Sequence, residues 1–450
     1  MTPSTPAACT LAAAAAATAW RDVPDAARRM ALGLTLDALA IVAGGAMHPD
    51  MERLVKKTGS GSDGAATVIA RNRTAAMRDA IFLNAACTTV LQRQDGYANA
   101  KGHPASQMVP LLLAIAETRE LGTEAFLTAL VAGYETGARV GVALGGVPSH
   151  LHDIGNWATV GLAAGAAHLL TGGDQDVLAA AIDGAASVGL AFDRFTTVGG
   201  ATLHHVYPAT SALTALGVAE AATAGLTALP GSLERTYGPH FGAHFDAEKL
   251  VAGVTGGRWT QFEIVNAYYK LHPSCAHIHG TNDAVAALIA EQNLRENDIA
   301  QVRIATFGEA MEIDAEAPHN DLAARFSARA TVAAAIRYGA LDDEGLLDLE
   351  ALEPLMARID VAHDPSLDRH IPAGRPGRVT IETTDGRRLE KEIIHPRGTP
   401  QVPATETERL DKARTLLARA YGADGAERIL SLCANLDAMP LADLSSALRA

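Results

Sequence analysis

The amino-acid sequence predicts a mainly α-helical protein with a smaller α+β part, and three observations lead to this fold class. Apolar residues make up 48% of the chain but aromatic residues only 4%, and alanine supplies much of the apolar share, which is typical of closely packed helices. Apolar residues recur at helical spacing through roughly the first 260 positions, and a strand-like alternation begins only after them. Because 450 residues are too many for one ordinary hydrophobic core, we expect two domains.

Residues 1–262 predict the helical domain. Its first helix is the alanine-rich segment 7–20, which no Lys or Arg precedes, so that a signal sequence is not favoured. An amphipathic helix follows at 24–43, and Gly44-Gly45 is expected to stop it. Gly, Pro and Asp residues separate the remaining helices, which are predicted at 76–92, 107–120, 123–144, 157–171, 175–191, 208–224 and 247–254.

Residues 263–400 predict an α+β domain. A strand is expected at 299–307, and 378–394 has the pattern of a hairpin around Asp385-Gly386, a strong turn signal. Helices are predicted between these strands at 279–293, 323–339 and 348–356. Residues 401–450 return to helices at 406–421, 424–433 and 441–449, which we expect to pack on the first domain.

Charge and cysteine content exclude several classes of function. The formal net charge of −14 argues against a nucleic-acid partner, and an anionic substrate would need a local cationic pocket. No stretch reaches the ~20 strongly apolar residues of a membrane span, so no membrane partner is expected. The four cysteines form no CxxC pair, which favours a reducing cytoplasm.

Three further motif classes are not favoured. Residues 59–64 match the spacing of a dinucleotide-binding loop, but 51–57 before them are charged and helix-like instead of forming a buried strand, so a turn is the better interpretation. The sequence has no GxSxG elbow and no recognisable cysteine nucleophile signature. His277 and His279 lie two apart with no HExxH motif, which argues against a metal site.

Two clusters of reactive side chains suggest one shared pocket. Residues 95–103 contain a carboxylate, a phenol, an ammonium and an imidazole on a loop that leads into a helix, although a simple turn is the alternative interpretation. Residues 269–283 place Lys270 and three imidazoles, those of His272, His277 and His279, at the start of another helix. Further histidines precede helices at 150–152 and 204–205, where a structural role is the alternative for any single one.

Taken together, these segments resemble the MmgE/PrpD family, which includes 2-methylcitrate dehydratase, cis-aconitate decarboxylase and iminodisuccinate epimerase. The likeness spans most of the chain, and the order and spacing of the motifs are more specific than any one of them. The matching landmarks are Gln94-Asp95-Gly96, Gly102-His103-Pro104, His152 with Gly155-Asn156-Trp157, residues 200–207, residues 270–275 with His279, Arg325-Phe326-Ser327, residues 384–387 and residues 396–398.

The resemblance implies a large all-helical domain built from both chain ends plus a smaller α+β lid, usually as a homodimer, with the pocket between domain and lid. It implies chemistry without a metal or an organic cofactor, in which a proton is removed next to a carboxylate. His103, His152 and Lys270 match active-site residues of the family, and Asp95 matches an acid of its aspartate-rich loop.

These matches, with their neighbours, give the candidate site. Lys270 would stabilise an enolate-like charge, while His103 or His152 would act as base and the other, or Tyr97, as acid. Asp95 would orient a histidine, and Lys101 and Arg325 would hold substrate carboxylates. The candidate catalytic residues are Asp95, Tyr97, His103, His152, Tyr207, Lys270 and His272, and the candidate substrate-binding residues are Lys101, His204, His279 and Arg325.

The chain differs from many family members at two places, which suggests a divergent branch. Gln92 and Arg93 stand where many members have an additional aspartate, and Ala201-Thr202 stand where many have a lysine. We expect a cofactor-independent dehydratase that acts on a small hydroxylated di- or tricarboxylate. An isomerase, epimerase or decarboxylase on a related acid and a catalytically silent family member are the alternatives.

Overall fold

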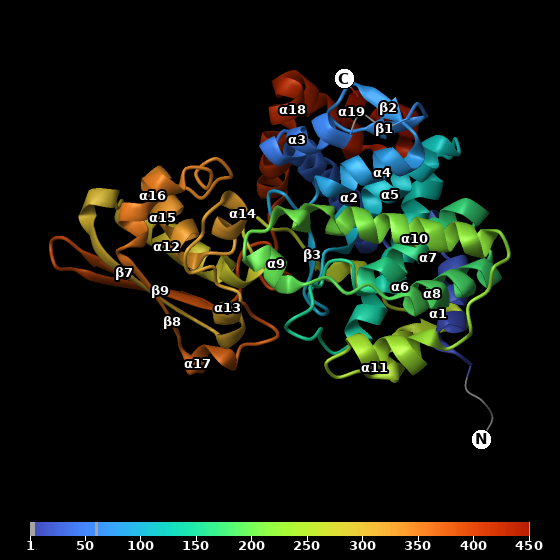
Figure 1. The fold of residues 1–450 in the computed structure, drawn as a ribbon, viewed down its shortest axis with the longest axis horizontal. Coiled ribbons are helices and arrows are strands. Elements are labelled where there is room, and N and C mark those ends of the chain that lie inside the picture. Colours follow the sequence, from blue (N-terminus) through green and yellow to red (C-terminus); the bar gives the residue numbers. More distant parts are fainter. Residues whose placement is uncertain (1–4, 59–61, 450) are drawn as a thin grey trace.

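The computed structural model describes residues 5–58 and 62–449, which form a large helical body and a smaller α+β body beside it (Figure 1). This is the fold class that the sequence predicts. The main helices of the large body are α1 Ala7–Ala16, α2 Asp25–Ala46, α4 Met77–Ala86, α5 Pro104–Thr118, α6 Thr123–Ala143, α7 Trp157–Thr171, α8 Gln175–Val188, α10 Tyr207–Thr223, α18 Glu406–Ala434 and α19 Leu441–Arg449.

Both ends of the chain contribute to the core of the helical body. Side chains of α1 and α2 share one hydrophobic cluster with Leu416 and Leu417 of α18 and Leu448 of α19. Small residues let these helices approach closely: a Cβ added to Gly161 of α7 would lie 2.7 Å from the Gly133 carbonyl oxygen of α6. The alanine- and glycine-rich composition therefore corresponds to tight helix packing.

The smaller body contains a four-stranded sheet of order β10-β9-β7-β8. The strands are β7 Ile299–Thr306, β8 Ile359–His363, β9 Gly377–Thr383 and β10 Arg388–Ile393, and the helices α12 His279–Gln292, α15 Ala328–Tyr338 and α16 Leu349–Met356 pack with them in a second core. Strands β9 and β10 form the predicted antiparallel hairpin, and Gly386 in its turn has φ 88°.

Short elements complete the two bodies. They are α3 Pro49–Thr58, β1 Ala66–Val68, β2 Arg73–Ala75, β3 Gly96–Tyr97, α9 Arg194–Val198, α11 Gly238–Phe241, β4 Val254–Thr255, β5 Arg258–Trp259, β6 Ala267–Tyr268, α13 Gly308–Glu312, α14 Asp321–Ala324 and α17 Pro365–Asp368. Strands β3 and β6 pair with each other and so join the two reactive sequence clusters. The predicted domain boundaries at 262/263 and 400/401 stay predictions.

The structure corrects several predicted elements. Residues 247–254 contain a 3-10 turn, Ala247–Val251, instead of an α-helix, and glycines with left-handed backbone follow it at 253, 256 and 257. The helix predicted at 323–339 is divided into α14 and α15, because Ser327 caps the start of α15. Strand β8 was not predicted. By contrast, the break predicted between the helices at 406–421 and 424–433 is present as a kink in α18, where Gly422 has the non-helical angles φ 68° and ψ 179°.

Helix α2 contradicts two expectations. It continues through Gly44 and Gly45 to Ala46 instead of stopping before them. By length and composition alone, α2 could also cross a membrane, and it is the one such helix among the described residues. The prediction that no such stretch exists is therefore wrong. Because 72% of its apolar window is buried inside the fold, α2 has the character of a core helix. The predicted dinucleotide-like loop, 59–64, lies partly outside the described residues.

Gly45 is required by a close approach of two helices, and this gives a stability prediction. A Cβ at Gly45 would lie 2.2 Å from the Cys87 carbonyl oxygen, whereas a Cβ at Gly217 in α10 meets no atom within 4 Å. We expect Gly45→Ala to lower the free energy of unfolding by about 1–3 kcal/mol. Gly217→Ala should leave it unchanged or raise it by ~0.5–1 kcal/mol.

Thermal and urea unfolding of the two variants measure this difference. Equal stability of Gly45→Ala and Gly217→Ala would contradict the close packing of α2 against the end of α4.

Candidate active site between the two bodies

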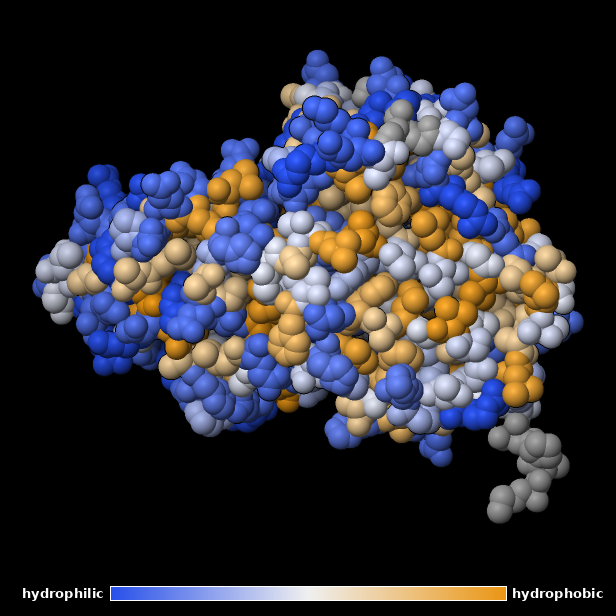
Figure 2. Space-filling view, viewed as in Figure 1, coloured by the Kyte–Doolittle hydropathy of each residue, from blue (hydrophilic) through white to orange (hydrophobic). Residues whose placement is uncertain are grey.

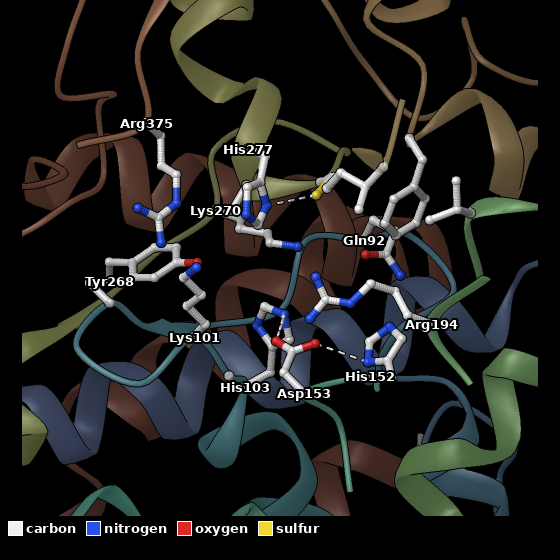
Figure 3. A pocket seen from close by; sticks show the side chains of 17 residues that line it. Gln92, Lys101, His103, His152, Asp153, Arg194, Tyr268, Lys270, His277 and Arg375 are labelled. Carbon is white, nitrogen blue, oxygen red and sulfur yellow. Dashed lines mark hydrogen bonds and ion pairs between the residues drawn. The ribbon is translucent and has the colours of Figure 1, made fainter. Parts of the chain in front are cut away.

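A cavity lies where the two bodies meet, and both reactive sequence clusters reach it (Figure 3). The empty space inside it, including open solvent at its mouth, is about 630 Å³. Its polar lining consists of Gln92, Lys101, His103, His152, Asp153, Arg194, Tyr268, Lys270, Cys275, His277 and Arg375. Four of the predicted site residues, Lys101, His103, His152 and Lys270, are therefore together.

His103 is held with one ring nitrogen free to accept a proton. Its Nδ1 forms a short hydrogen bond with the Asp95 carbonyl oxygen, so Nδ1 carries the proton and Nε2 does not. Burial, with a further contribution from the Lys270 charge, lowers the pKa of His103 to about 4. The imidazole is therefore neutral near pH 7 and is suited to act as a base.

Asp95 fixes this arrangement through the start of α5. Its carboxylate accepts hydrogen bonds from the backbone amides of Ala105 at 3.0 Å and Ser106 at 2.8 Å, which satisfies free amides of the first helical turn. Burial raises the pKa of Asp95 to about 6. Asp95 therefore orients His103 through its backbone carbonyl, while its carboxylate lies outside the cavity lining.

Asp153 contacts both predicted catalytic histidines. Its carboxylate lies 2.9 Å from His152 Nδ1 and 3.6 Å from His103 Nε2. Although burial alone would raise the pKa of Asp153, the neighbouring His152 and His103 hold it well below its usual range. The Ile154 amide also lies 3.0 Å from His152 Nδ1. That nitrogen accepts from the amide only without a proton and donates to Asp153 only with one, so the two contacts favour different tautomers of His152.

Lys270 supplies a buried ammonium. The residue is 1% exposed, and burial lowers its pKa to about 8. Among the described residues, no hydrogen bond or ion pair involves its Nζ, and Figure 3 shows the side chain reaching into the cavity. The charge is therefore available to an anionic group in the cavity.

The rest of the lining is also cationic. Lys101 Nζ lies 2.6 Å from a Glu309 carboxylate oxygen, and the same carboxylate lies 3.5 Å from His277 Nε2. Burial lowers the pKa of His277 to about 4, and its Nδ1 lies 3.4 Å from the Cys275 Sγ. Four cationic side chains line the cavity against one lining carboxylate, Asp153, in a protein of net charge −14. The local field therefore favours an anionic ligand.

Backbone conformation and close packing shape the cavity wall. Helix α4 ends at Ala86 instead of near residue 92, and the following turn brings Gln92 to the cavity with φ 50°. Lys101 has φ 51°, and a Cβ on the next residue, Gly102, would lie 2.4 Å from Trp157. Non-glycine residues with left-handed backbone often occur at functional sites.

Two predicted tyrosines do not lie in the cavity. Tyr97 is fully buried and its hydroxyl hydrogen-bonds to the Glu263 carboxylate, and burial raises its pKa. The Tyr207 hydroxyl donates to the Asp193 carbonyl oxygen at 3.3 Å, while its ring packs against His152. Both hydroxyls bond to other protein groups outside the cavity lining, so the structure does not bring either Tyr97, the predicted acid, or Tyr207, a further catalytic candidate, into the cavity.

Three of the predicted histidines lie outside the cavity lining and contact other protein groups. His204 is buried behind His152 and contacts Gln92 Nε2 at 3.1 Å and Thr197 Oγ1 at 2.9 Å. His272 Nε2 lies 2.8 Å from an Asp283 carboxylate oxygen. His279 contacts the Ser274 carbonyl oxygen and lines a smaller neighbouring pocket. The structure therefore does not bring His204, His272 or His279 into the cavity.

Arg325 is also outside the cavity, and the prediction that it holds a substrate carboxylate is corrected. Its guanidinium is fully buried, with Nη1 2.9 Å from an Asp343 oxygen and 3.0 Å from the Leu91 carbonyl oxygen. A guanidinium neutralised by a buried carboxylate is not available to substrate. Arg325 instead joins the two bodies.

The positions that differ from many family members have distinct surroundings. Gln92 lines the cavity as a neutral amide, whereas Arg93 forms an ion pair with Asp343 at 3.0 Å outside the lining. Ala201 and Thr202 are exposed. A different cation, Arg194 at the start of α9, reaches the cavity from the segment that precedes them.

Sequence reasoning missed several lining residues. Asp153 could have been found, because it directly follows His152. Arg194, Tyr268 and Arg375 carry no motif that distinguishes them in the sequence. Among the described residues, no group of three His, Cys, Asp or Glu side chains could hold a metal ion.

Comparisons with known proteins agree with this architecture. The family model for the MmgE/PrpD N-terminal domain matches residues 9–251. The family model for the MmgE/PrpD C-terminal domain matches residues 272–438. The chain belongs to the MmgE/PrpD family. A cis-aconitate decarboxylase-like protein, oryM, from Aspergillus oryzae (strain ATCC 42149 / RIB 40) is 26% identical over 467 residues, covering 94% of each chain.

The first matched region lies in the helical body, and the second covers the α+β body together with α18, which packs in the helical body. These comparisons support an enzyme of the MmgE/PrpD type.

The surroundings of His103 predict how its pKa responds to a change at Lys270. Because the Lys270 ammonium contributes to the low pKa of His103, Lys270→Met should raise this pKa above about 4. His168 is a matched control, since burial alone lowers its pKa to about 4, and that pKa should not move. Titration of labelled histidines by NMR measures both. An unchanged His103 pKa in Lys270→Met would contradict the proximity of the two groups.

Proposed function

We propose that this protein is a cofactor-independent lyase, a dehydratase, that acts on a small hydroxylated di- or tricarboxylate. The observation that carries the proposal is one cationic cavity that both the unprotonated Nε2 of His103 and the ammonium of Lys270 reach. A base beside a cation is what removal of a proton next to a carboxylate requires, because negative charge develops on the substrate as the proton leaves.

In the proposed reaction, His103 Nε2 takes the proton from the carbon next to a substrate carboxylate. Lys270 stabilises the enolate-like charge, in a site where low solvent access strengthens the interaction. His152 then gives a proton to the leaving hydroxyl, and Asp153 stabilises whichever imidazole carries positive charge. The hydroxyl departs as water and a carbon–carbon double bond forms.

Decarboxylation of an unsaturated tricarboxylate is the second candidate, and the printed name of the Aspergillus oryzae relative favours it. Loss of carbon dioxide leaves a similar carbanion, which Lys270 would stabilise and an imidazolium would protonate. The two candidates therefore share residues but differ in the bond that breaks.

We also propose that the chain forms a homodimer. The face that carries α8, α9 and α10 has apolar surface (Figure 2). Exposed apolar side chains of these elements and of the turn before α10 include Val188, Phe195 and Leu203, which are 52%, 55% and 68% exposed. Exposed apolar side chains of this kind favour contact with another protein surface. The expected cytoplasmic location also stays a prediction.

The proposed base predicts a specific loss of proton exchange. Incubation with hydroxylated and unsaturated polycarboxylates in deuterated water should give exchange next to a carboxylate and a new double bond, observed by NMR. His103→Ala should slow exchange by ~10²- to 10⁴-fold. His150→Ala removes an exposed imidazole near the same loop and should leave exchange unchanged.

Each outcome of this experiment has a distinct meaning. Carbon dioxide release without loss of hydroxyl would favour the decarboxylase. Inversion alone would favour an epimerase, and inertness across the panel would favour a silent family member. Full exchange in a folded His103→Ala variant would show that another group is the base.

The pKa of Lys270 predicts an alkaline limit to activity. Because the pKa is lowered to about 8, the ammonium is present below that pH and is lost as the pH rises through it. The value of kcat/KM for the free enzyme should therefore fall above about pH 8. Lys270→Arg should keep reduced activity without this fall, because guanidinium stays protonated. The control variant Lys101→Arg should still lose activity above about pH 8. An unchanged alkaline fall of kcat/KM in Lys270→Arg would assign this titration to another group.

A further inference from the structure

We propose that Arg194 and Arg375 bind two carboxylates at opposite ends of one ligand, so that the ligand links the helical body to the α+β body. The inference deepens the proposed function, on which it rests for the identity of the cavity as the substrate site. It specifies that the substrate carries at least two separated carboxylates, and it assigns a binding residue to each.

The two arginines come from different bodies and reach the same cavity. Arg194 is the first residue of α9 in the helical body, and Arg375 lies just before β9 in the α+β body. Figure 3 shows them on opposite sides of the cavity, with Lys270 and His103 between them in that view. A ligand held at both ends would therefore place its middle carbons near the proposed base and ammonium.

Each guanidinium is fixed by backbone carbonyls but keeps nitrogens for a ligand. Arg194 donates through Nε to the Leu151 carbonyl oxygen at 3.1 Å. Arg375 donates through Nη1 to the carbonyl oxygens of Pro372 at 2.8 Å and Gly374 at 2.6 Å. The other guanidinium nitrogens form no hydrogen bond within the described residues. These are Nη1 and Nη2 of Arg194 and Nε and Nη2 of Arg375. Anchored guanidinium groups with free nitrogens suit carboxylate binding.

The nearby charges do not neutralise these two side chains. The Asp153 carboxylate is close enough for Arg194 to contribute to its low pKa, but its oxygens contact His152 and His103. Arg375 faces Tyr268 and His277, which are neutral near pH 7 because burial raises the pKa of the first and lowers that of the second. By contrast, the buried Arg139 and Arg325 each contact a carboxylate within 3.0 Å.

Arg194 supplies a cation to the cavity from the segment just before a position where the sequence differs from many relatives. Ala201 and Thr202 stand where many members have a lysine, and both are exposed. Arg194, seven residues before Ala201, supplies a positive charge from α9, the helix that precedes them. A guanidinium binds a carboxylate in a fixed planar geometry that an ammonium does not impose, so Arg194 would hold a carboxylate in one orientation.

The test uses ligands that cannot react, so that it is independent of turnover. Succinate and succinamate have the same length and differ by one carboxylate charge, and neither has a hydroxyl to lose. Isothermal titration at low salt should show that the unmodified protein binds succinate about 10- to 100-fold more tightly than succinamate, as expected for one charged hydrogen-bonded contact. Arg194→Ala and Arg375→Ala should each remove most of this preference.

Control variants separate loss of ligand binding from loss of a distant positive charge or of the fold. Arg387→Ala removes a guanidinium that pairs with Asp385 in the β9–β10 turn, and it should keep the preference for succinate. Arg194→Lys and Arg375→Lys should retain part of it, and unliganded melting temperatures identify any variant that has lost its fold. Preference for succinate that persists in both folded alanine variants would overturn the inference, as would equal binding of the two ligands by the unmodified protein.

Failure of the proposed function has a different signature. Absence of turnover across hydroxylated polycarboxylates, together with arginine-dependent binding of succinate, would remove the lyase proposal and keep the two-arginine site.

Discussion

The carboxylate of Asp343 is the interaction on which the cavity depends, because it joins the two bodies. It belongs to the α+β body and lies 2.9 Å from Arg325 Nη1 of the same body. It also lies 3.0 Å from Arg93 and 3.1 Å from Arg419, which both belong to the helical body. Three guanidinium groups share one carboxylate that is almost fully buried, and removal of a buried partner of this kind typically costs ~3–5 kcal/mol. Since Gln92 precedes Arg93 directly, the junction also fixes one wall of the cavity.

Within the described part of the chain, the cations where the two bodies meet fall into a paired group and an unpaired group. The chain carries a net charge of −14, and the cations at the interface are of two kinds. Arg93, Arg325 and Arg419 are neutralised by Asp343 and hold the bodies together. Lys270 and the cavity arginines lie a short distance away without such a partner among the described residues. An anionic ligand would complete the charge balance of the interface, so binding and the relative position of the bodies are coupled.

Much of the fold follows from the sequence, because periodicity and breakers determine most helices. The boundaries at 123–144 and 157–171 agree with α6 and α7 to within one residue. The failures have local causes. Gly44-Gly45 do not stop α2, because tertiary contact with Cys87 uses their lack of side chains. Strand β8 was missed because it is short and mostly exposed at the edge of the sheet, so its sequence lacks an apolar alternation.

The candidate site was predictable where reactive residues lie close together in the sequence. His103, Lys101, His152 and Lys270 do reach one cavity, but motif membership did not separate them from Tyr97, His204, His272 and Arg325, which are used in packing and ion pairs. Burial beside a partner is what distinguishes the two groups, and the sequence does not contain that information. Arg194 and Arg375 show the converse, since isolated arginines become site residues only through tertiary structure.

The lowered pKa values of His103 and Lys270 have one main cause, the burial of both groups in the lining of the same cavity. Burial disfavours the charged form of each, and their mutual repulsion adds to the low pKa of the imidazole. Because imidazole begins with the lower pKa, it loses its proton first and becomes a base, while the amine keeps its proton up to about pH 8. Two groups that would compete for a proton in water thus take complementary roles. Asp95 completes this division by holding the His103 proton on Nδ1, which leaves Nε2 as the nitrogen that faces the cavity.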